Sequence, residues 1–206
     1  MNISRYISTR VYPAGIGLIL LCLALSGCDL QFGWVVTETP VVTAVPRQTE
    51  LTLKQSRRFH DYFLHPLYDF ECEARVLSAR RYYFGRETDL VPVDLALGWR
   101  QMSDYNVIRK MRISQFGRWY FYRYEYPPIP VKDIITNSAN MHLIPANKRI
   151  ERAVGKARRG NIVSFTGQLV NVKAEDGWHW NTSTSRTDSG DHACELVFVE
   201  RFEIKE

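Results

Sequence analysis

The feature that most constrains the fold of this chain is an alternation of apolar and polar residues that recurs along its C-terminal two thirds. Residues 70–84 alternate and are rich in aromatic side chains, and two further stretches, 111–114 and 118–126, flank the tripeptide Gln115-Phe116-Gly117. Successive side chains of a β-strand point to opposite faces, so this pattern favours strands, and the short interruption predicts a hairpin. The chain is therefore expected to have a β-rich core.

The C-terminal quarter indicates how these strands close. Residues 161–173 predict a long strand whose apolar residues change faces around Gly167, where we expect a bulge that switches the register. A hairpin and a closing strand over 193–204 follow. Such an order is typical of a small, partly open barrel of the OB or SH3 kind. The predicted fold class is α+β and β-rich, with one or two short helices.

Short helical segments are expected at several places. Residues 52–62 are polar and precede a proline, Ser103-Asp104 can cap a segment that runs to Arg109, and Asn147 can cap a helix that ends at Gly160. The last helix would present a basic outer side, made of Lys148, Arg149, Arg152, Lys156, Arg158 and Arg159. This side suits acidic lipid headgroups or an acidic partner, although such a surface is usually only solvated.

A different pattern marks the N-terminus. Residues 14–25 are apolar, and Arg5 and Arg10 precede them. As a helix this run would extend about 20 Å, which is less than the roughly 30 Å hydrocarbon core of a bilayer, so it predicts a signal peptide. An uncleaved membrane anchor and an ordinary secretory signal remain as alternatives. The run ends in Leu25-Ser26-Gly27-Cys28, which resembles the lipobox of a bacterial lipoprotein signal peptide.

The resemblance implies that residues 1–27 are removed and that Cys28 carries several acyl chains, which together give stable anchoring. The protein would then lie on the periplasmic side of the bacterial cell envelope. Asp29 resembles the signal that retains enterobacterial lipoproteins at the inner membrane, but the choice between inner and outer membrane stays open. Residues 28–50 contain two prolines and predict an extended tether, with an edge strand as the alternative. Residues 51–206 would form one globular domain.

Two cysteines remain in the mature chain, and both lie on the apolar side of a predicted strand. Cys72 and Cys194 are an even remainder in an oxidising compartment, which favours one disulfide. The alternative is two buried thiols. Removing residues 1–27 takes the formal charge from +5 to +3, and this mild surplus does not indicate nucleic acid as a partner.

Two segments are candidates for binding. The strand at 118–126 places four tyrosines on one face, where they either stack on a ligand such as a sugar ring or pack against the core. These are Tyr120, Tyr122, Tyr124 and Tyr126. The loop 181–192 is polar and is either a binding loop or a solvated hairpin loop. Its candidate residues are Ser185, Arg186, Asp188 and Asp191.

The sequence gives little support for an enzyme. Spacings typical of serine hydrolases, zinc proteases, P-loops and dinucleotide-binding folds do not occur. His179, His192 and Cys194 contain zinc-ligand atoms, but Cys194 is better explained by the disulfide. We therefore expect no catalytic residue, no metal and no cofactor.

The domain resembles uncharacterised bacterial envelope proteins in three regions: Leu-Ala-Leu-Gly-Trp at 95–99 with 102–104, Ile-Ser-Gln at 113–115 with 117–121, and Ser-Ala-Asn-Met-His at 138–142. The resemblance supports a single folded unit and adds no chemistry. The leading hypothesis is a lipid-anchored, non-catalytic subunit that binds another envelope protein. The alternatives are a glycan or peptidoglycan-binding module that uses the tyrosine row, and an envelope hydrolase that uses His179 or His192 with Asp188.

Overall fold

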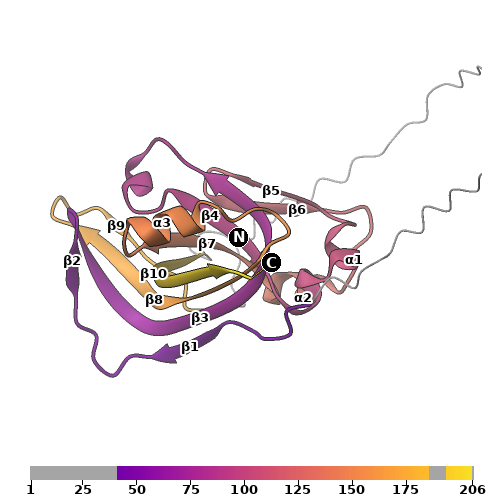
Figure 1. Cartoon of the computed structure of the whole chain (residues 1–206), viewed down its shortest axis with the longest axis horizontal. Coiled ribbons are helices and arrows are strands. Elements are labelled where there is room, and N and C mark those ends of the chain that lie inside the picture. Colours follow the sequence, from indigo (N-terminus) through magenta and orange to yellow (C-terminus); the bar gives the residue numbers. More distant parts are fainter. Residues whose placement is uncertain (1–40, 186–193, 206) are drawn as a thin grey trace, which may run out of the picture.

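The structure is a computed structural model that describes residues 41–185 and 194–205 (Figure 1). Its described part is β-rich, and its helices are short. The strands are β1 Arg47–Glu50, β2 Arg57–Phe59, β3 Tyr62–Arg81, β4 Val93–Gly98, β5 Arg112–Phe116, β6 Trp119–Arg123, β7 Ser138–Pro145, β8 Ile162–Ala174, β9 His179–Trp180 and β10 Glu195–Ile204. The helices are α1 Tyr105–Ile108, α2 Val131–Thr136 and α3 Lys148–Val154, with 3-10 turns η1 Arg86–Asp89 and η2 Arg100–Ser103. None of these helices is long and apolar enough to span a membrane.

Five strands close into a ring. They pair in the order β3, β4, β7, β10, β8 and back to β3. The pair of β7 with β10 is parallel, and the other four pairs are antiparallel. This order, with α3 between the third and fourth barrel strands, is that of an OB-type barrel. The expected β-rich, α+β barrel is confirmed, and the strand order selects OB over SH3.

The strand β3 is the longest strand described, and it pairs with four others. It pairs with β8 from Tyr62 to Arg75, with β4 near its C-terminal end, and with the short strands β1 and β2 along its N-terminal half. Register shifts between Pro66 and Tyr68 and between Val76 and Ser78 interrupt the pairing. Bulges of this kind increase the bend and twist of a strand, which closing a small barrel requires. Figure 1 shows β3 curving around one side of the molecule.

The barrel interior is apolar, and it is filled by alternate residues of the five strands. Phe70 and Phe165 are among the largest of these side chains, and both are fully buried. The close approach of β8 to β10 needs a glycine at position 167, because a Cβ there would lie 1.9 Å from the carbonyl oxygen of Phe198. The register shift in this pair lies in β10, between Val199 and Arg201, and not at Gly167 as expected.

The change of face in β8 has a simpler cause than a bulge. Val163 and Phe165 point into the barrel, whereas Val170 and Val172 belong to a second apolar cluster on its outer surface. Trp178 and Trp180 pack against that second cluster. The strand is therefore buried on both faces over part of its length, and no switch of register is needed.

A third apolar cluster joins the barrel to the β5–β6 hairpin. Met102 and Ile134 are fully buried there, and Tyr122 packs against them from the hairpin. The hairpin, α1 and α2 all lie on the same side of the barrel in Figure 1. α1 starts at the expected cap, since the Asp104 side chain accepts a hydrogen bond from the backbone N–H of Asn106.

The helix α3 begins as expected and ends early. The side chain of Asn147 accepts hydrogen bonds from the backbone N–H groups of Arg149 and Ile150, which is the predicted N-cap. The helix stops at Val154, however, so Lys156, Arg158 and Arg159 lie in the segment after it. α3 packs against β7 and β10.

Two expectations for the N-terminal part of the domain are wrong. Residues 52–62 form no helix, because Phe59 pairs with Tyr62 across a tight turn in which His60 has a φ of 54°. Residues 41–50, assigned to the tether, pack on the barrel instead: Val42 is buried, and β1 pairs with β3. The alternative, an edge strand at Val35-Val36 and Val41-Val42, is not the strand observed either, since β1 lies at Arg47–Glu50 and Val41 and Val42 are in no strand. The predicted signal peptide, Cys28 and the rest of the predicted tether lie outside the described residues.

Candidate functional site

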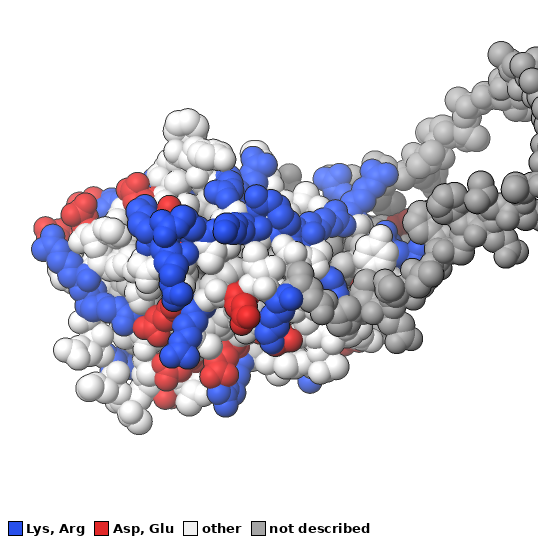
Figure 2. All heavy atoms as spheres, viewed as in Figure 1, with Lys and Arg blue, Asp and Glu red and all other residues white. Residues whose placement is uncertain are grey.

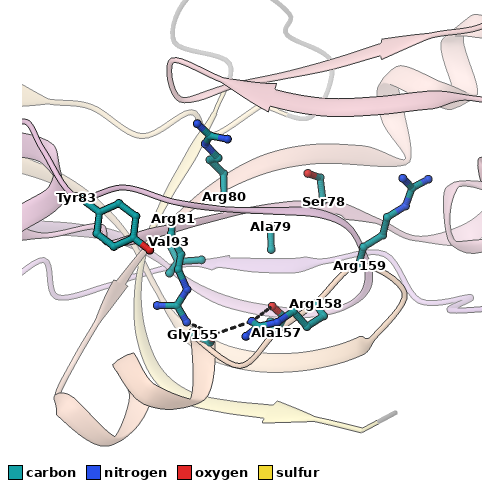
Figure 3. A pocket seen from close by; sticks show the side chains of 10 residues that line it. All are labelled: Ser78, Ala79, Arg80, Arg81, Tyr83, Val93, Gly155, Ala157, Arg158 and Arg159. Carbon is teal, nitrogen blue, oxygen red and sulfur yellow. Dashed lines mark hydrogen bonds between the residues drawn. The ribbon is translucent and has the colours of Figure 1, made fainter.

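An open pocket of about 570 Å³ lies where the end of β3 and the start of β4 meet the segment after α3 (Figure 3). Four arginines set its chemical character, two from each side. Arg80 and Arg81 come from β3, and Arg158 and Arg159 come from the segment after α3. The lining contains no acidic residue. A pocket with this composition suits an anion.

Two of these arginines are held by the protein backbone. Arg81 donates a hydrogen bond from Nη2 to the carbonyl oxygen of Gly155. Arg158 donates from Nη1 to the carbonyl oxygens of Gly155 and Ala157, at 2.8 and 2.9 Å. Figure 3 shows both guanidinium groups converging on Gly155. Since a guanidinium has five N–H donors, both arginines keep donors for a ligand.

The backbone at Gly155 allows this arrangement. A Cβ at that position would lie 2.8 Å from Nη2 of Arg81 and 3.1 Å from the carbonyl oxygen of Glu151. Any larger residue would therefore push Arg81 away from the carbonyl that fixes it. Gly155 is thus part of the pocket's geometry as well as the C-cap of α3.

All four arginines are exposed to solvent, but the other two are not held in this way. Arg80 and Arg159 are exposed, and neither makes a hydrogen bond or an ion pair with another described residue. In Figure 3, Arg80 points away from Gly155, on the opposite side of β3 from Arg81. A planar guanidinium can bind a phosphate or carboxylate through two parallel hydrogen bonds, so these groups suit an anionic ligand at the pocket rim.

The pocket continues into a larger basic surface. Figure 2 shows Lys and Arg side chains running as a band across the face that carries α3. The predicted basic residues Lys148, Arg149, Arg152 and Lys156 are exposed, as expected. Glu151 lies among them, but it is engaged by Lys148 at 2.8 Å. Most of the positive charge on this face is therefore left without an acidic neighbour.

A buried charge cluster lies on the outer surface of the β4–β7 pair. Asp94 is fully buried, and its Oδ1 lies 3.0 Å from Nη1 of Arg118 and 2.9 Å from Nδ1 of His142. Arg118 also donates to the Thr88 hydroxyl and to the Val91 carbonyl. Asp94 Oδ2 has no hydrogen-bond partner among the described residues.

Aromatic rings surround this cluster. The Arg118 guanidinium lies 4.0 Å from the ring centre of Tyr82 and 5.5 Å from that of Trp180, and the Trp180 ring contacts His142. Burial, and next the charge of Asp94, raise the pKa of Tyr82 to about 12. Arg118 sits in the hairpin turn with a φ of 66°. The cluster fastens this turn to β4 and β7, so we assign it a structural role.

The predicted tyrosine row packs against the core. Tyr120, Tyr122 and Tyr124 are partly buried on the third apolar cluster, and Tyr126 is 79% exposed. The Tyr120 hydroxyl lies within hydrogen-bond distance of the Ser138 hydroxyl. The packing alternative therefore agrees with the structure, and the three packed rings do not form an open platform for a sugar.

The polar loop is only partly described. Ser185 is exposed, and its backbone N–H donates to the Ser183 hydroxyl. Arg186, Asp188 and Asp191 lie outside the described residues, as does His192. Of the predicted loop residues, only Ser185 is described, and it does not line the arginine pocket.

The predicted disulfide is not formed. Cys72 points into the barrel interior, whereas Cys194 lies next to Asn140 on the outer surface, with 4.0 Å between its Sγ and the Asn140 Nδ2. Each thiol does share a face with apolar residues, but the two faces lie on opposite sides of the barrel wall. Among the described residues, no group of three or more His, Cys, Asp or Glu side chains is placed to hold a metal ion.

The sequence prediction missed Arg80 and Arg81. The sequence contains three Arg-Arg pairs, at 57–58, 80–81 and 158–159, and only the last two line the pocket, so the pairs alone did not identify it. The fold defines a β-rich protein built on a five-stranded barrel with a basic pocket at one end. No family model, no curated protein and no solved structure matches the chain.

Proposed function

We propose that the protein is a lipid-anchored, non-catalytic binding subunit on the periplasmic side of the bacterial cell envelope, and that it holds an envelope protein partner by an acidic group bound in the arginine pocket. The observation that carries the binding role is the pocket lining, which has four arginines and no acid. The proposal of a lipid anchor is based on the lipobox-like sequence that ends at Cys28. Binding is preferred over catalysis because the catalytic spacings considered do not occur in the sequence.

The physical argument is one of charge and pre-organisation. Arg81 and Arg158 are fixed by backbone carbonyls, so they lose little side-chain freedom when an anion binds. Arg80 and Arg159 are exposed and can add hydrogen bonds at the rim. A carboxylate presented by a protein partner would thus meet both fixed and adaptable donors.

The test is crosslinking in living cells with the full-length, lipidated protein. A photo-crosslinking residue at Ser78, which lines the pocket, should capture a recurrent protein in the wild-type background. The double variant Arg80→Gln, Arg159→Gln should reduce that capture at least tenfold, because it removes two unpaired cations and leaves the fixed arginines in place. Acyl labelling of wild type and Cys28→Ala checks the anchor in the same cells.

A matched control separates the pocket from the general positive charge. Arg149→Gln with Arg152→Gln removes the same charge from α3 outside the pocket lining. This control should retain most of the capture. Equal losses in both double variants would assign the effect to overall charge, and no loss in either would remove the pocket from the proposal.

A further inference from the structure

The β5–β6 hairpin has an outer face that core packing does not explain. Phe116 pairs with Trp119, Ser114 with Phe121, and Arg112 with Arg123. Paired residues of a two-stranded sheet point to the same side, so these six side chains form one surface, which we call the outer hairpin face. Phe116 is 75% exposed, Trp119 40% and Phe121 44%.

The opposite side of the same hairpin does the packing. Ile113 and Tyr122 form one cross-strand pair, and Gln115 and Tyr120 form the next. Ile113, Tyr120 and Tyr122 lie against the third apolar cluster, and the Gln115 amide donates a hydrogen bond to the Asn140 side chain at 2.6 Å. The hairpin is therefore already attached to the barrel, and the three outward rings add nothing to that attachment.

The charges on the outer hairpin face have one sign. Arg112 and Arg123 stand directly opposite each other, and like charges in that position repel. Neither forms an ion pair with another described residue, and the face contains no acidic side chain. Aromatic rings next to unpaired arginines are the residues that favour the headgroup region of an anionic bilayer.

The position of this face relative to the proposed anchor is also suitable. The backbone N–H of Val42 donates to the Ser103 hydroxyl, and the adjacent Met102 belongs to the cluster under the hairpin. Thirteen residues, 29–41, separate Val42 from Cys28. Their fully extended length is at most about 50 Å, so a lipid on Cys28 keeps the hairpin within reach of the membrane surface.

We propose that the outer hairpin face rests on the anionic membrane in which the lipid is anchored, with Phe116, Trp119 and Phe121 at the level of the headgroups and Arg112 and Arg123 against lipid phosphates. The proposal rests on the lipid anchor of the proposed function, but not on the arginine pocket. This contact fixes how the domain is oriented on the bilayer.

The test uses the full-length lipidated protein in vesicles of phosphatidylethanolamine and phosphatidylglycerol whose acyl chains carry bromine, which quenches nearby tryptophan. Subtracting the emission of Trp119→Phe isolates Trp119 from the other four tryptophans. We expect at least half of the Trp119 emission to be quenched. Phe116→Ser with Phe121→Ser, and separately Arg112→Gln with Arg123→Gln, should each at least halve that quenching.

Tyr126→Ser is the matched control, because Tyr126 is an exposed aromatic residue outside the hairpin strands. It should leave the quenching unchanged. Co-sedimentation with the vesicles reports the anchor separately. Co-sedimentation without quenching of Trp119 overturns the inference alone, and equal quenching in vesicles without phosphatidylglycerol overturns the role of the arginines. A protein that does not co-sediment overturns the anchor and this inference together.

Discussion

Asp94 is the acidic partner of Arg118 in the attachment of the hairpin turn. Its carboxylate is fully buried, and it faces both the Arg118 guanidinium and the His142 ring. A buried ion pair is weak support for stability as such, because desolvation offsets much of the attraction. Removing one partner is different, since it leaves the other charge buried without compensation.

The variant Asp94→Asn is therefore expected to lower the free energy of unfolding by about 3–5 kcal/mol, the usual cost of breaking a buried pair. Urea unfolding monitored by circular dichroism measures this change. Asp61→Asn, the same substitution at an exposed turn, should leave the unfolding midpoint close to that of wild type. Similar midpoints for both variants would contradict a stabilising role for the cluster.

Tyr82 gives a prediction for alkaline pH. Burial, and next the Asp94 charge, raise its pKa to about 12, so the folded protein holds the phenol proton more tightly than the unfolded chain does. This contribution to stability is complete below about pH 10, the ordinary tyrosine pKa, and is lost as the pH rises toward about 12. Unfolding midpoints measured from pH 9 to 11.5 should fall more steeply for wild type than for Tyr82→Phe. Tyr126→Phe, at an exposed position, should keep the wild-type slope.

At the scale of elements, β8 and β10 approach each other closely at Gly167. We expect Gly167→Ala to lower the free energy of unfolding by at least about 2 kcal/mol, because overpacking of this kind forces the backbone to shift. The added Cβ would lie 1.9 Å from the Phe198 carbonyl oxygen. Chemical denaturation measures the loss, and Thr166→Ala on the same strand is the control without a clash. A Gly167→Ala protein as stable as wild type would mean that the strands separate there at little cost.

The elements also show what periodicity can and cannot predict. Alternation identified the strands and the hairpin, because period two is a local property of the backbone. It did not identify which of two buried faces a residue occupies. For this reason the predictions of a bulge at Gly167 and of a disulfide were both wrong. Cys72 and Cys194 were each correctly placed on an apolar face, but one face is the barrel interior and the other is its outer surface.

The arginine pocket could not be predicted from the sequence for a different reason. Arg81 and Gly155 are 74 residues apart, and only the pairing of β3, β4 and β8 and the placement of α3 bring them together. The prediction of a helix at 52–62 was wrong because the polar composition of this segment carries no information about the β2–β3 turn. Capping residues predicted the starts of α1 and α3 well, since a cap acts within three residues.

At the scale of the whole molecule, the closed ring and the two-stranded hairpin differ in how they are held. Each of the five ring strands pairs on both sides, whereas β5 and β6 pair only with each other. We expect backbone amides of β3 and β8 to exchange with deuterium at least tenfold more slowly than those of β5 and β6. Hydrogen exchange followed by mass spectrometry measures this difference. Equal protection would indicate that hairpin and barrel open as one unit.

The position of β10 in the ring also determines when the barrel can close. This strand is inserted between β7 and β8, and it follows both of them along the chain, so the ring has a gap until residues 195–204 have been synthesised. A nascent chain that lacks them should therefore be digested rapidly by protease, and the complete chain should resist. For the exported protein proposed above, late closure of this kind would keep the polypeptide unfolded while it passes through a translocation pore.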